Sequence, residues 1–339
     1  MKDTVIGMDI AKNVFQLHVV DPDTGEMQRI KLKRAQVAEY FANRPAAVVA
    51  MEACGGAHYW AGVVQRLGHT VKLLASAAVR PFVPRNKNDA ADARAIWTAV
   101  QQPGARLVAI KSPTQQAVLA LHRMRAQLKK VRHMQSNALR GLLLEFGLAL
   151  PEGYGALCKA MPATLAQCAE QLPAVLVDTL REQWARVAQI DQQMALIERR
   201  LAQMERATPA CQSIRAIPGI GPLTASAAIA TIGDAHYFRN GRELAAWLGL
   251  VPRQVGTGGR IELRGISKRG DTYLRTLLMQ GARSVLSRTK NPSAWLTGLL
   301  ARRPYNVVVA ALANKMARTL WAVLVKGKPF DPKAFSALG

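Results

Sequence analysis

Short apolar runs alternate with polar turns over the first hundred residues, and this pattern predicts strands interleaved with helices. The strands are expected over Val5–Asp9, Val14–Val20, Gln28–Leu32, Ala46–Glu52 and Thr70–Leu74, and the helices over Val37–Asn43 and Tyr59–Leu67. Alternation of this kind is typical of an α/β layer built around a mixed sheet. We therefore expect residues 1–112 to form an α/β domain.

Residues 113–206 carry a helical periodicity instead. One long helix is predicted from Thr114 to about Gly147, with a coiled-coil seam of Leu121, Met124, Leu128, Val131, Met134, Ala138 and Leu142. After a connector over Pro151–Pro173, a second seam follows at Leu180, Trp184, Val187, Met194, Ile197, Leu201 and Met204. The two helices are expected to pair antiparallel, within one chain or across a dimer.

Residues 207–339 are predicted to be mainly helical with one small β-hairpin. The stretch Ile217–Pro222 precedes an alanine-rich helix and resembles a helix-hairpin-helix module, in which Gly219 and Gly221 would let backbone N–H groups reach a phosphate. An ordinary interhelical turn is the alternative. Two short strands, Arg253–Val255 and Arg260–Leu263, flank a glycine-rich tip with Thr257. Helices are expected over Thr272–Ser287 and Val307–Lys326, with a tail after the second.

The net charge of the chain limits the classes of molecule that it is expected to bind. Lys and Arg total 46 against 22 acidic residues, a net charge of +24, which points to a polyanion such as nucleic acid. A membrane surface is the competing polyanion, but we find no apolar run near the roughly 20 residues that span a bilayer. The N-terminus leaves no room for a signal peptide, and the four scattered cysteines suggest a reduced, cytoplasmic protein. The six histidines form no cluster and receive no role.

Two groups of basic residues are candidates for contacts with nucleic acid. The first long helix carries Arg123, Arg125, Lys129, Lys130 and Arg132 on its outer face, where acidic residues are nearly absent. This favours a phosphate-facing surface over an ordinary solvated face. The second group is Arg253, Arg260, Lys268 and Arg269, which lie close in sequence to Thr257. A hydroxyl among cations suits attack on a phosphodiester, although a plain turn threonine fits as well.

Four carboxylates form the strongest chemical signal. Asp9 and Glu52 end apolar strands, and Asp89 and Asp92 fall on one face of a helix that Asn88 can cap. Neighbouring carboxylates repel each other unless a divalent cation lies between them, and Mg²⁺ prefers carboxylate oxygen. A capped helix start and strand-end turns are the alternative. The whole set favours a ribonuclease-H-like domain that uses metal ions for phosphoryl transfer.

These motifs together resemble one family across nearly the whole chain. The stretches that carry the resemblance are Ile6–Lys12, Met51–Gly55, Asn86–Arg94, Ile217–Gly221, Ala246–Arg253, Gly256–Gly259 and Ile266–Asp271. They are similar to transposases of the insertion-sequence 110 family, 1111 subgroup, which are related to Piv-type DNA invertases. The resemblance implies a RuvC-like N-terminal domain, a coiled-coil linker and a C-terminal transposase domain.

The resemblance also implies a mechanism. The tetrad Asp9, Glu52, Asp89 and Asp92 would bind Mg²⁺ or Mn²⁺, and a serine of the C-terminal domain would attack DNA to form a covalent intermediate. A homodimer assembling to a tetramer would form composite active sites. A structured non-coding (bridge) RNA of the element would pair with donor and target DNA, in a bacterial cytoplasm at the nucleoid.

Position 257 departs from the family pattern, because the chain has Thr257 where the family usually has its serine. A threonine hydroxyl is secondary and its χ1 is stiffer. Thr257 is therefore the nucleophile, or Ser267 replaces it, or this copy is catalytically weak. The main functional hypothesis is an RNA-guided DNA recombinase that excises and inserts its own element. The alternatives are a metal-dependent Holliday-junction-type nuclease and a catalytically impaired nucleic-acid-binding protein.

Overall fold

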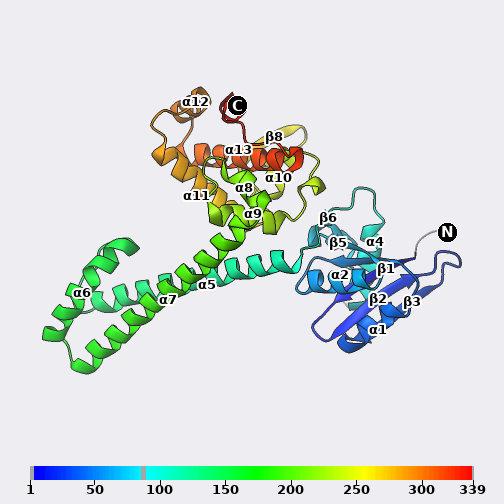
Figure 1. Cartoon of the computed structure of the whole chain (residues 1–339), viewed down its shortest axis with the longest axis horizontal. Coiled ribbons are helices and arrows are strands. Elements are labelled where there is room, and N and C mark those ends of the chain that lie inside the picture. The colour runs from blue at the N-terminus through cyan, green and yellow to red at the C-terminus, as the bar shows by residue number, and fades with distance from the viewer. Residues whose placement is uncertain (1–3, 85–88, 338–339) are drawn as a thin grey trace. The chain divides into compact units, whose positions relative to one another are not determined.

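The computed structural model describes residues 4–84 and 89–337 of the chain. It divides into two compact units, residues 1–116 with 229–243, and residues 117–228 with 244–339. The first unit is a mixed α/β sheet domain, and the second is mainly helical with one β-hairpin (Figure 1). The second unit thus includes most of the expected coiled coil together with most of the expected C-terminal domain.

The first unit is organised around a six-stranded sheet in the order β3-β2-β1-β4-β5-β6. Its strands are β1 Val5–Ile10, β2 Val14–Val20, β3 Met27–Lys33, β4 Val48–Glu52, β5 Thr70–Leu74 and β6 Leu107–Val108. β1, β4 and β5 run parallel, while β2, β3 and β6 are each antiparallel to a neighbour. The five strands expected from the sequence are confirmed, and only the two-residue β6 was missed.

Helices cover both faces of this sheet. The helices of the unit are α1 Val37–Ala42, α2 Ala57–Arg66, α3 Ser76–Val79 and α4 Asp89–Val100, with 3₁₀ turns at Arg34–Gln36, Arg80–Phe82 and Ala235–Tyr237. Met8 and Met51 pack with side chains of α1 and α2. Ala50 and Leu74 pack on the opposite face with α3 and α4. Successive residues of a strand point to opposite faces, so this alternation assigns every strand position to one of the two layers.

Two long helices of the second unit pair antiparallel within one chain. α5 spans Pro113–Leu144 and α7 spans Ala174–Arg206. Arg125 of α5 forms an ion pair with Glu198 of α7 at 2.6 Å, and Arg132, seven residues later, pairs with Asp191, seven residues earlier, at 2.7 Å. These two ion pairs show that α5 and α7 run in opposite directions. The antiparallel pairing is therefore confirmed, and it lies within the chain.

The seam predicted for α5 was wrong. The side chains buried on α5 are Val118, His122, Ser136, Leu139 and Leu143, whereas Met124, Met134 and Leu142 are more than half exposed at 53%, 61% and 52%. Arg125 and Arg132 lie on the covered side, because their charged ends reach the carboxylates of α7. α5 thus has an apolar stripe on a face that α7 does not cover. The seam of α7 is confirmed at Leu180, Val187, Met194, Ile197 and Leu201.

The connector predicted over Pro151–Pro173 contains a helix, α6 Tyr154–Gln171, with Pro162 inside it. Leu157, Met161 and Cys168 recur at helical spacing and are buried against α5 and α7. This packing outweighs the hydrogen bond that Pro162 cannot donate. The connector prediction was therefore wrong over Tyr154–Gln171, where the apolar periodicity forms a packed helix.

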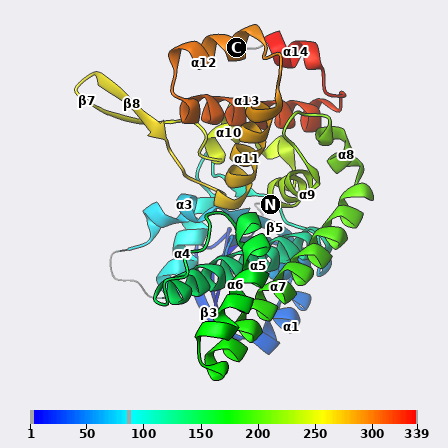
Figure 2. The same ribbon diagram turned by 90° about the vertical axis from the view of Figure 1, so that its left-hand side faces the viewer.

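The helices of the C-terminal half gather around α13. They are α8 Pro209–Arg215, α9 Pro222–Ile232, α10 Gly241–Trp247, α11 Thr272–Arg288, α12 Ala294–Arg302, α13 Tyr305–Lys326 and α14 Pro332–Ala337. α8, α11 and α12 all contact α13, and α14 contacts α12. The strands β7 Pro252–Thr257 and β8 Arg260–Ile266 pair only with each other and extend away from these helices (Figure 2). The mainly helical region with a small β-hairpin is confirmed.

α13 corrects the sequence prediction that no segment is apolar enough to cross a bilayer. Its 22 residues meet that requirement by length and composition. Half of its most apolar window is buried within the protein, where Val309, Leu312 and Met316 form part of the core. The core helix of a globular unit has the same composition, so this helix by itself is weak support for a membrane span.

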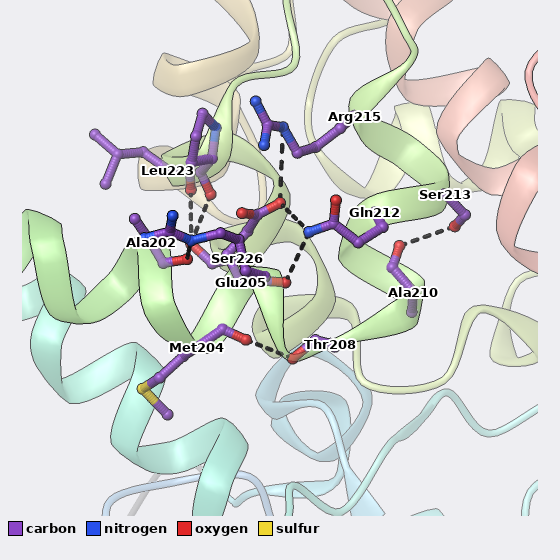
Figure 3. Close-up of polar contacts among 12 residues, drawn as sticks. Ala202, Met204, Glu205, Thr208, Ala210, Gln212, Ser213, Arg215, Leu223 and Ser226 are labelled. Atoms are coloured by element: carbon purple, nitrogen blue, oxygen red, sulfur yellow. Dashed lines mark hydrogen bonds and ion pairs between the residues drawn. The ribbon is translucent and has the colours of Figure 1, made fainter.

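A buried carboxylate holds the turn between α7 and α8. Glu205 is 1% exposed and accepts a hydrogen bond from Gln212 Nε2 at 3.1 Å. Arg215 Nε lies 3.7 Å from the same carboxylate (Figure 3). Burial raises the pKa of the Cys211 thiol to about 11, and the negative charge of Glu205 makes a smaller contribution in the same direction. The carboxylate therefore joins the end of the long helix α7 to α8.

Candidate active site

Asp9 and Glu52 lie side by side at the carboxyl ends of two parallel strands. β1 and β4 are in register through the pair Met8 and Met51, and the two acidic residues follow directly. Met8 and Met51 point to the α1–α2 side, so Asp9 and Glu52 occupy positions on the α4 side. Both side chains are half-buried. The strand register therefore brings together two of the four carboxylates predicted as metal ligands.

The thiol of Cys54 lies near the two carboxylates. Burial raises its pKa, and the negative charges of Glu52 and Asp9 raise it further. A charge in a partly buried site is only weakly screened by water, so it acts on the groups beside it. Cys54, which follows β4 by two residues, therefore lies within the field of both carboxylates.

Gly7 brings α4 against β1. A Cβ at position 7 would lie 2.3 Å from the Ala93 carbonyl oxygen and 2.7 Å from the Trp97 backbone nitrogen, so only glycine permits this approach. Trp97 Nε1 also donates a hydrogen bond to the Val5 carbonyl oxygen at 3.1 Å. The helix is thereby held next to the strand that carries Asp9.

Asp92 lies on α4 directly before Ala93, and its side chain is half-buried. Asp89 is the first residue of α4, but its side chain lies outside the described part of the structure, as do Asn88 and its cap. In the part of the chain that the structure describes, no group of three His, Cys, Asp or Glu side chains lies close enough to hold a metal ion. The donors that meet at the ends of β1 and β4 are carboxylate oxygens, the kind of ligand that hard divalent cations take.

The β7–β8 hairpin carries Thr257 next to its turn. Thr257 pairs with Arg260, and the intervening Gly258 and Gly259 have φ of 57° and 84°. Two positive φ values at the centre of a two-residue loop require glycine or a similar residue, which explains the glycine pair. The side chain of Thr257 lies outside the described part. The hairpin predicted around this position is confirmed, with longer strands than expected.

Register places position 257 on the charged face of the hairpin. Val255 pairs with Glu262 and Thr257 with Arg260, so these positions share one face, while Ile261 lies on the other. The cations predicted to lie close in sequence to Thr257 are all exposed. Arg260 pairs with position 257, whereas Arg253, Lys268 and Arg269 lie towards the base of the hairpin. Ser267, the alternative nucleophile, lies after β8 and its backbone N–H donates to Val251.

The basic residues of α5 divide into two groups. Arg123, Lys129 and Lys130 are exposed. Arg125 and Arg132 are half-buried in ion pairs with α7, and the Arg132 guanidinium also lies 4.0 Å over the ring of Tyr154. The two paired arginines neutralise carboxylates of their own chain, so a phosphate-facing surface on α5 depends on the other three.

The two glycines of the Ile217–Pro222 turn have different surroundings. Gly219 has φ of 83°, and a Cβ there would lie 2.8 Å from the carbonyl oxygen of Gly281 on α11. Its backbone is thus packed inside the helical unit. A Cβ at Gly221 would meet nothing within 4 Å, and this residue directly precedes α9. Of the two, Gly221 has the space that an incoming phosphate would need.

Comparison with known proteins matches the chain to one family. Residues 6–147 match the model of the IS110 DEDD transposase domain, and residues 211–295 match that of the Transposase IS116/IS110/IS902 family. A "Probable family 20 transposase" of Pseudomonas aeruginosa is 48% identical over 96% of this chain and 98% of its own length. The transposases of IS1328 from Yersinia enterocolitica and of IS1111A from Coxiella burnetii are 40% and 39% identical, over 97% of this chain and over 98% and 92% of their own lengths.

The chain belongs to the IS110/IS116/IS902 family of transposases. Such a transposase binds DNA, cuts it and rejoins it. The DEDD domain match covers the strands that carry Asp9 and Glu52 and the helix that carries Asp92. The family resemblance inferred from the sequence motifs is therefore confirmed.

Sequence reasoning about this transposase missed several residues. It gave His122 no role, yet the ring is 2% exposed and contacts Tyr273 Oη at 2.9 Å and Ser226 Oγ at 3.0 Å, joining α5 to α11 and α9. Arg275 is buried in the first turns of α11. Neither residue stands out in the sequence, because the partners of His122 are more than a hundred residues away and two of the three groups bound by Arg275 are backbone carbonyls. Gly7 did have a signal, since a glycine inside a strand often marks a close approach.

Proposed function

We propose that this transposase excises and inserts its own insertion sequence with two sets of groups, carboxylates of the first unit and a hydroxyl of the β7–β8 hairpin. The observation that carries the proposal is the β1–β4 register. It places Asp9 and Glu52 at adjacent strand ends, on the side where Gly7 admits α4. The strand order, with β1 central between an antiparallel β2 and a parallel β4, supports a ribonuclease-H-like or RuvC-like domain.

Asp9, Glu52, Asp89 and Asp92 are proposed to hold Mg²⁺ or Mn²⁺. The all-oxygen donor set fits this class of ion and gives no preference for a soft metal. When bound, the ion would supply charge stabilisation for phosphoryl transfer.

Thr257 is proposed as the nucleophile. Its hydroxyl oxygen would form a bond to a DNA phosphorus while one P–O bond of the phosphodiester breaks. The threonine proton is lost to solvent, and the leaving oxygen takes up a proton to become a free hydroxyl end. In the reverse step, the free hydroxyl end of a DNA strand attacks the threonine–phosphate ester, which releases Thr257 and rejoins the DNA. Arg260, which is exposed and pairs with Thr257 across the hairpin, suits contact with the phosphate. Arg253, Lys268 and Arg269 lie towards the base of the hairpin and suit contacts with neighbouring phosphates.

Guidance by a structured RNA belongs to the same proposal. A net charge of +24 suits a protein that grips more than one nucleic-acid backbone, while base pairing would read sequence. Exposed Arg123, Lys129, Lys130 and the turn at Gly221 are candidate backbone contacts. A homodimer that assembles to a tetramer would bring the carboxylates and the hairpin of different copies together.

The deciding experiment is the trapping of a covalent protein–DNA adduct. Purified protein, the RNA of its own element, Mg²⁺ and labelled donor DNA would be combined for wild type, Thr257→Ala and Thr257→Ser. We expect an adduct in wild type that Thr257→Ala loses and Thr257→Ser keeps. An adduct that persists in Thr257→Ala but disappears in Ser267→Ala would move the nucleophile to Ser267. Metal-dependent cutting without an adduct in any variant would replace the proposal by a Holliday-junction-type nuclease.

A scrambled RNA is the control that tests whether the protein recognises the RNA of its own element. Binding of the element's RNA should exceed binding of a scrambled RNA of equal length by at least about tenfold at physiological salt, because backbone charge alone does not distinguish the two. Equal affinities would reduce the interaction to non-specific electrostatics and would remove RNA guidance from the proposal.

A further inference from the structure

The β7–β8 hairpin lacks the support that a sheet or a core gives to most strands. Its two strands pair only with each other, and Ile261 and Leu263 are 66% and 67% exposed. A two-stranded ribbon by itself is marginally stable in water. The direction in which this hairpin points must therefore be determined at its base, where the chain enters at Val251 and leaves at Ser267.

The two segments at the base are joined backbone to backbone. Ser267 N–H donates to the Val251 carbonyl oxygen at 2.8 Å, and Lys268 N–H donates to the Gly249 carbonyl oxygen at 3.1 Å. Lys268 adopts a φ of 55°, a conformation that a lysine takes only when its surroundings require it. The entering and leaving segments are thus held in one fixed arrangement.

Glycines make this contact as close as backbones allow. A Cβ at Gly249 would lie 2.3 Å from the Arg269 carbonyl oxygen, and a Cβ at Gly270 would lie 1.8 Å from the Trp247 carbonyl oxygen. Both glycines have a positive φ, 71° and 75°. Positions 249 and 270 thus have no room for a side chain, and the carbonyl groups of Leu248 and Arg269 in the two segments accept hydrogen bonds from donors on α11.

Arg275 supplies them. Its side chain comes from the first turns of α11 and the residue is 7% exposed. One terminal nitrogen, Nη1, donates to the Leu248 carbonyl oxygen at 2.9 Å and to the Arg269 carbonyl oxygen at 2.7 Å. The other, Nη2, donates to Thr272 Oγ1 at 3.1 Å. One guanidinium therefore ties the segment before the hairpin to the segment after it, and anchors both to α11.

We propose that Arg275 is a positioning residue for the hairpin nucleophile. The role rests on the proposed function of Thr257, because the residue acts by fixing the base from which the hairpin projects. Arg275 does not touch the reacting atoms. A rigid base holds position 257 and the neighbouring Arg260 in one orientation. This lowers the entropic cost of bringing the hydroxyl and the DNA phosphate into a reactive arrangement.

The planar guanidinium is required by this geometry. Two carbonyl oxygens and one hydroxyl oxygen are satisfied from two nitrogens of a rigid fork, which a single ammonium on a flexible stem cannot reproduce. Arg275→Lys should keep the positive charge and much of the packing while losing the simultaneous contact to both segments. Thr272→Val removes only the hydroxyl that orients the guanidinium and is the milder variant.

The test measures hydrogen exchange of the hairpin amides and adduct formation on the full-length protein. In Arg275→Lys, we expect the amides between Arg253 and Ile266 to exchange about tenfold faster, because local opening is favoured without global unfolding. The rate of adduct formation should fall about 10- to 100-fold, the range expected when a reacting group is misplaced by about 1 Å. DNA affinity should be unchanged. Thr272→Val should shift both readouts in the same direction by less.

The matched control is Arg283→Lys, which changes an exposed arginine of the same helix. It should alter neither readout. Unchanged exchange at residues 253–266 in Arg275→Lys would overturn the proposal, and so would an equal increase in α11 and α13, which would reduce Arg275 to general stability. If wild type forms no adduct, the proposed nucleophile fails, whereas the exchange measurement still decides whether Arg275 orders the hairpin.

Discussion

The backbone carbonyl of Ala93 packs against the Cα of Gly7, and this contact positions α4 beside the strand that carries Asp9. The Ala93 carbonyl oxygen lies 2.3 Å from the position that a Cβ of residue 7 would take. Ala93 follows Asp92 on α4, and Gly7 precedes Asp9 by two positions on β1. Because residue 7 has no side chain, β1 with Asp9 and α4 with Asp92 can pack in direct contact.

Gly7→Ala is expected to impair the site without altering any ligand. Its Cβ would force α4 away from β1, costing about 1–3 kcal/mol of unfolding free energy, as overpacking does in other cores. DNA cutting should fall more than DNA binding, because the carboxylates separate. Thermal unfolding and a cleavage assay measure the two effects.

The control for this change is Gly62→Ala on α2, where the nearest atom to a new Cβ is a flexible arginine end at 3.5 Å. Alanine there should raise stability by up to about 1 kcal/mol, since glycine is a poor helix residue. Full activity of Gly7→Ala with an unchanged unfolding temperature would show that α4 is not held by this contact.

The carboxylate site makes a second prediction. Asp9→Ala and Asp92→Ala should each abolish recombination and leave binding of DNA and RNA largely intact, because neither residue belongs to the basic surfaces. Addition of Mg²⁺ should raise the unfolding temperature of wild type but not of Asp9→Ala, by the linkage between ligand binding and stability. Asp23→Ala, in an exposed turn of the same unit, serves as the control. Retention of full activity by both site variants would refute the metal site.

The division of the α5 cations makes a third prediction. Lys129→Gln with Lys130→Gln removes two exposed charges, so the slope of log K against log salt should become shallower by about 2, at roughly 0.9 per lost duplex contact. The unfolding temperature should stay the same. An unchanged slope would exclude these lysines from the nucleic-acid surface.

Arg132→Met is the comparison on the covered side of the same helix. It removes the ion pair with Asp191 and the contact with the Tyr154 ring, and should cost about 1–2 kcal/mol of stability. Its effect on the salt slope should be smaller than that of the lysine pair. A larger effect on binding than on stability would show that Arg132 leaves α7 to contact nucleic acid.

His122 makes the fourth prediction, on pH dependence. Burial, with a smaller contribution from the positive charge of Arg125, lowers its pKa from the model-compound value of 6.5 to about 4. Below pH 6.5 the unfolded chain takes up a proton that the folded ring does not. The stabilising contribution of the neutral ring is therefore complete above pH 6.5 and is lost as the pH falls towards about 4.

This loss should be on the order of 3 kcal/mol, at about 1.4 kcal/mol for each pKa unit. His122→Gln keeps one donor and one acceptor for Tyr273 and Ser226 but does not titrate. Denaturant unfolding at a series of pH values should show a shallower acid decline in this variant. His133→Gln, on an exposed position of α5, should leave the decline as in wild type. Equal pH profiles for His122→Gln and wild type would show that the ring is not buried in its neutral form.

Local pattern was enough to predict much of the first unit and part of the second. The strands Val14–Val20 and Thr70–Leu74 were predicted to the residue, because apolar runs bounded by turn residues are short-range signals. Acidic residues directly after buried runs pointed to Asp9 and Glu52, and paired glycines pointed to the turn after Thr257. The seam of α7 was also predicted, since one face of that helix is clearly the more apolar.

Only the tertiary structure decided which surfaces meet. α5 has two stripes that could be covered, and its sequence does not state that Arg125 and Arg132 find carboxylates on α7. Gly219 looked like a phosphate-binding glycine, yet its space is taken by Gly281 from α11. His122 binds side chains more than a hundred residues away, and Arg275 binds two backbone carbonyl groups besides the nearby Thr272 hydroxyl. Periodicity records the faces of single elements, whereas contacts between elements depend on shape and partner chemistry that no single segment contains.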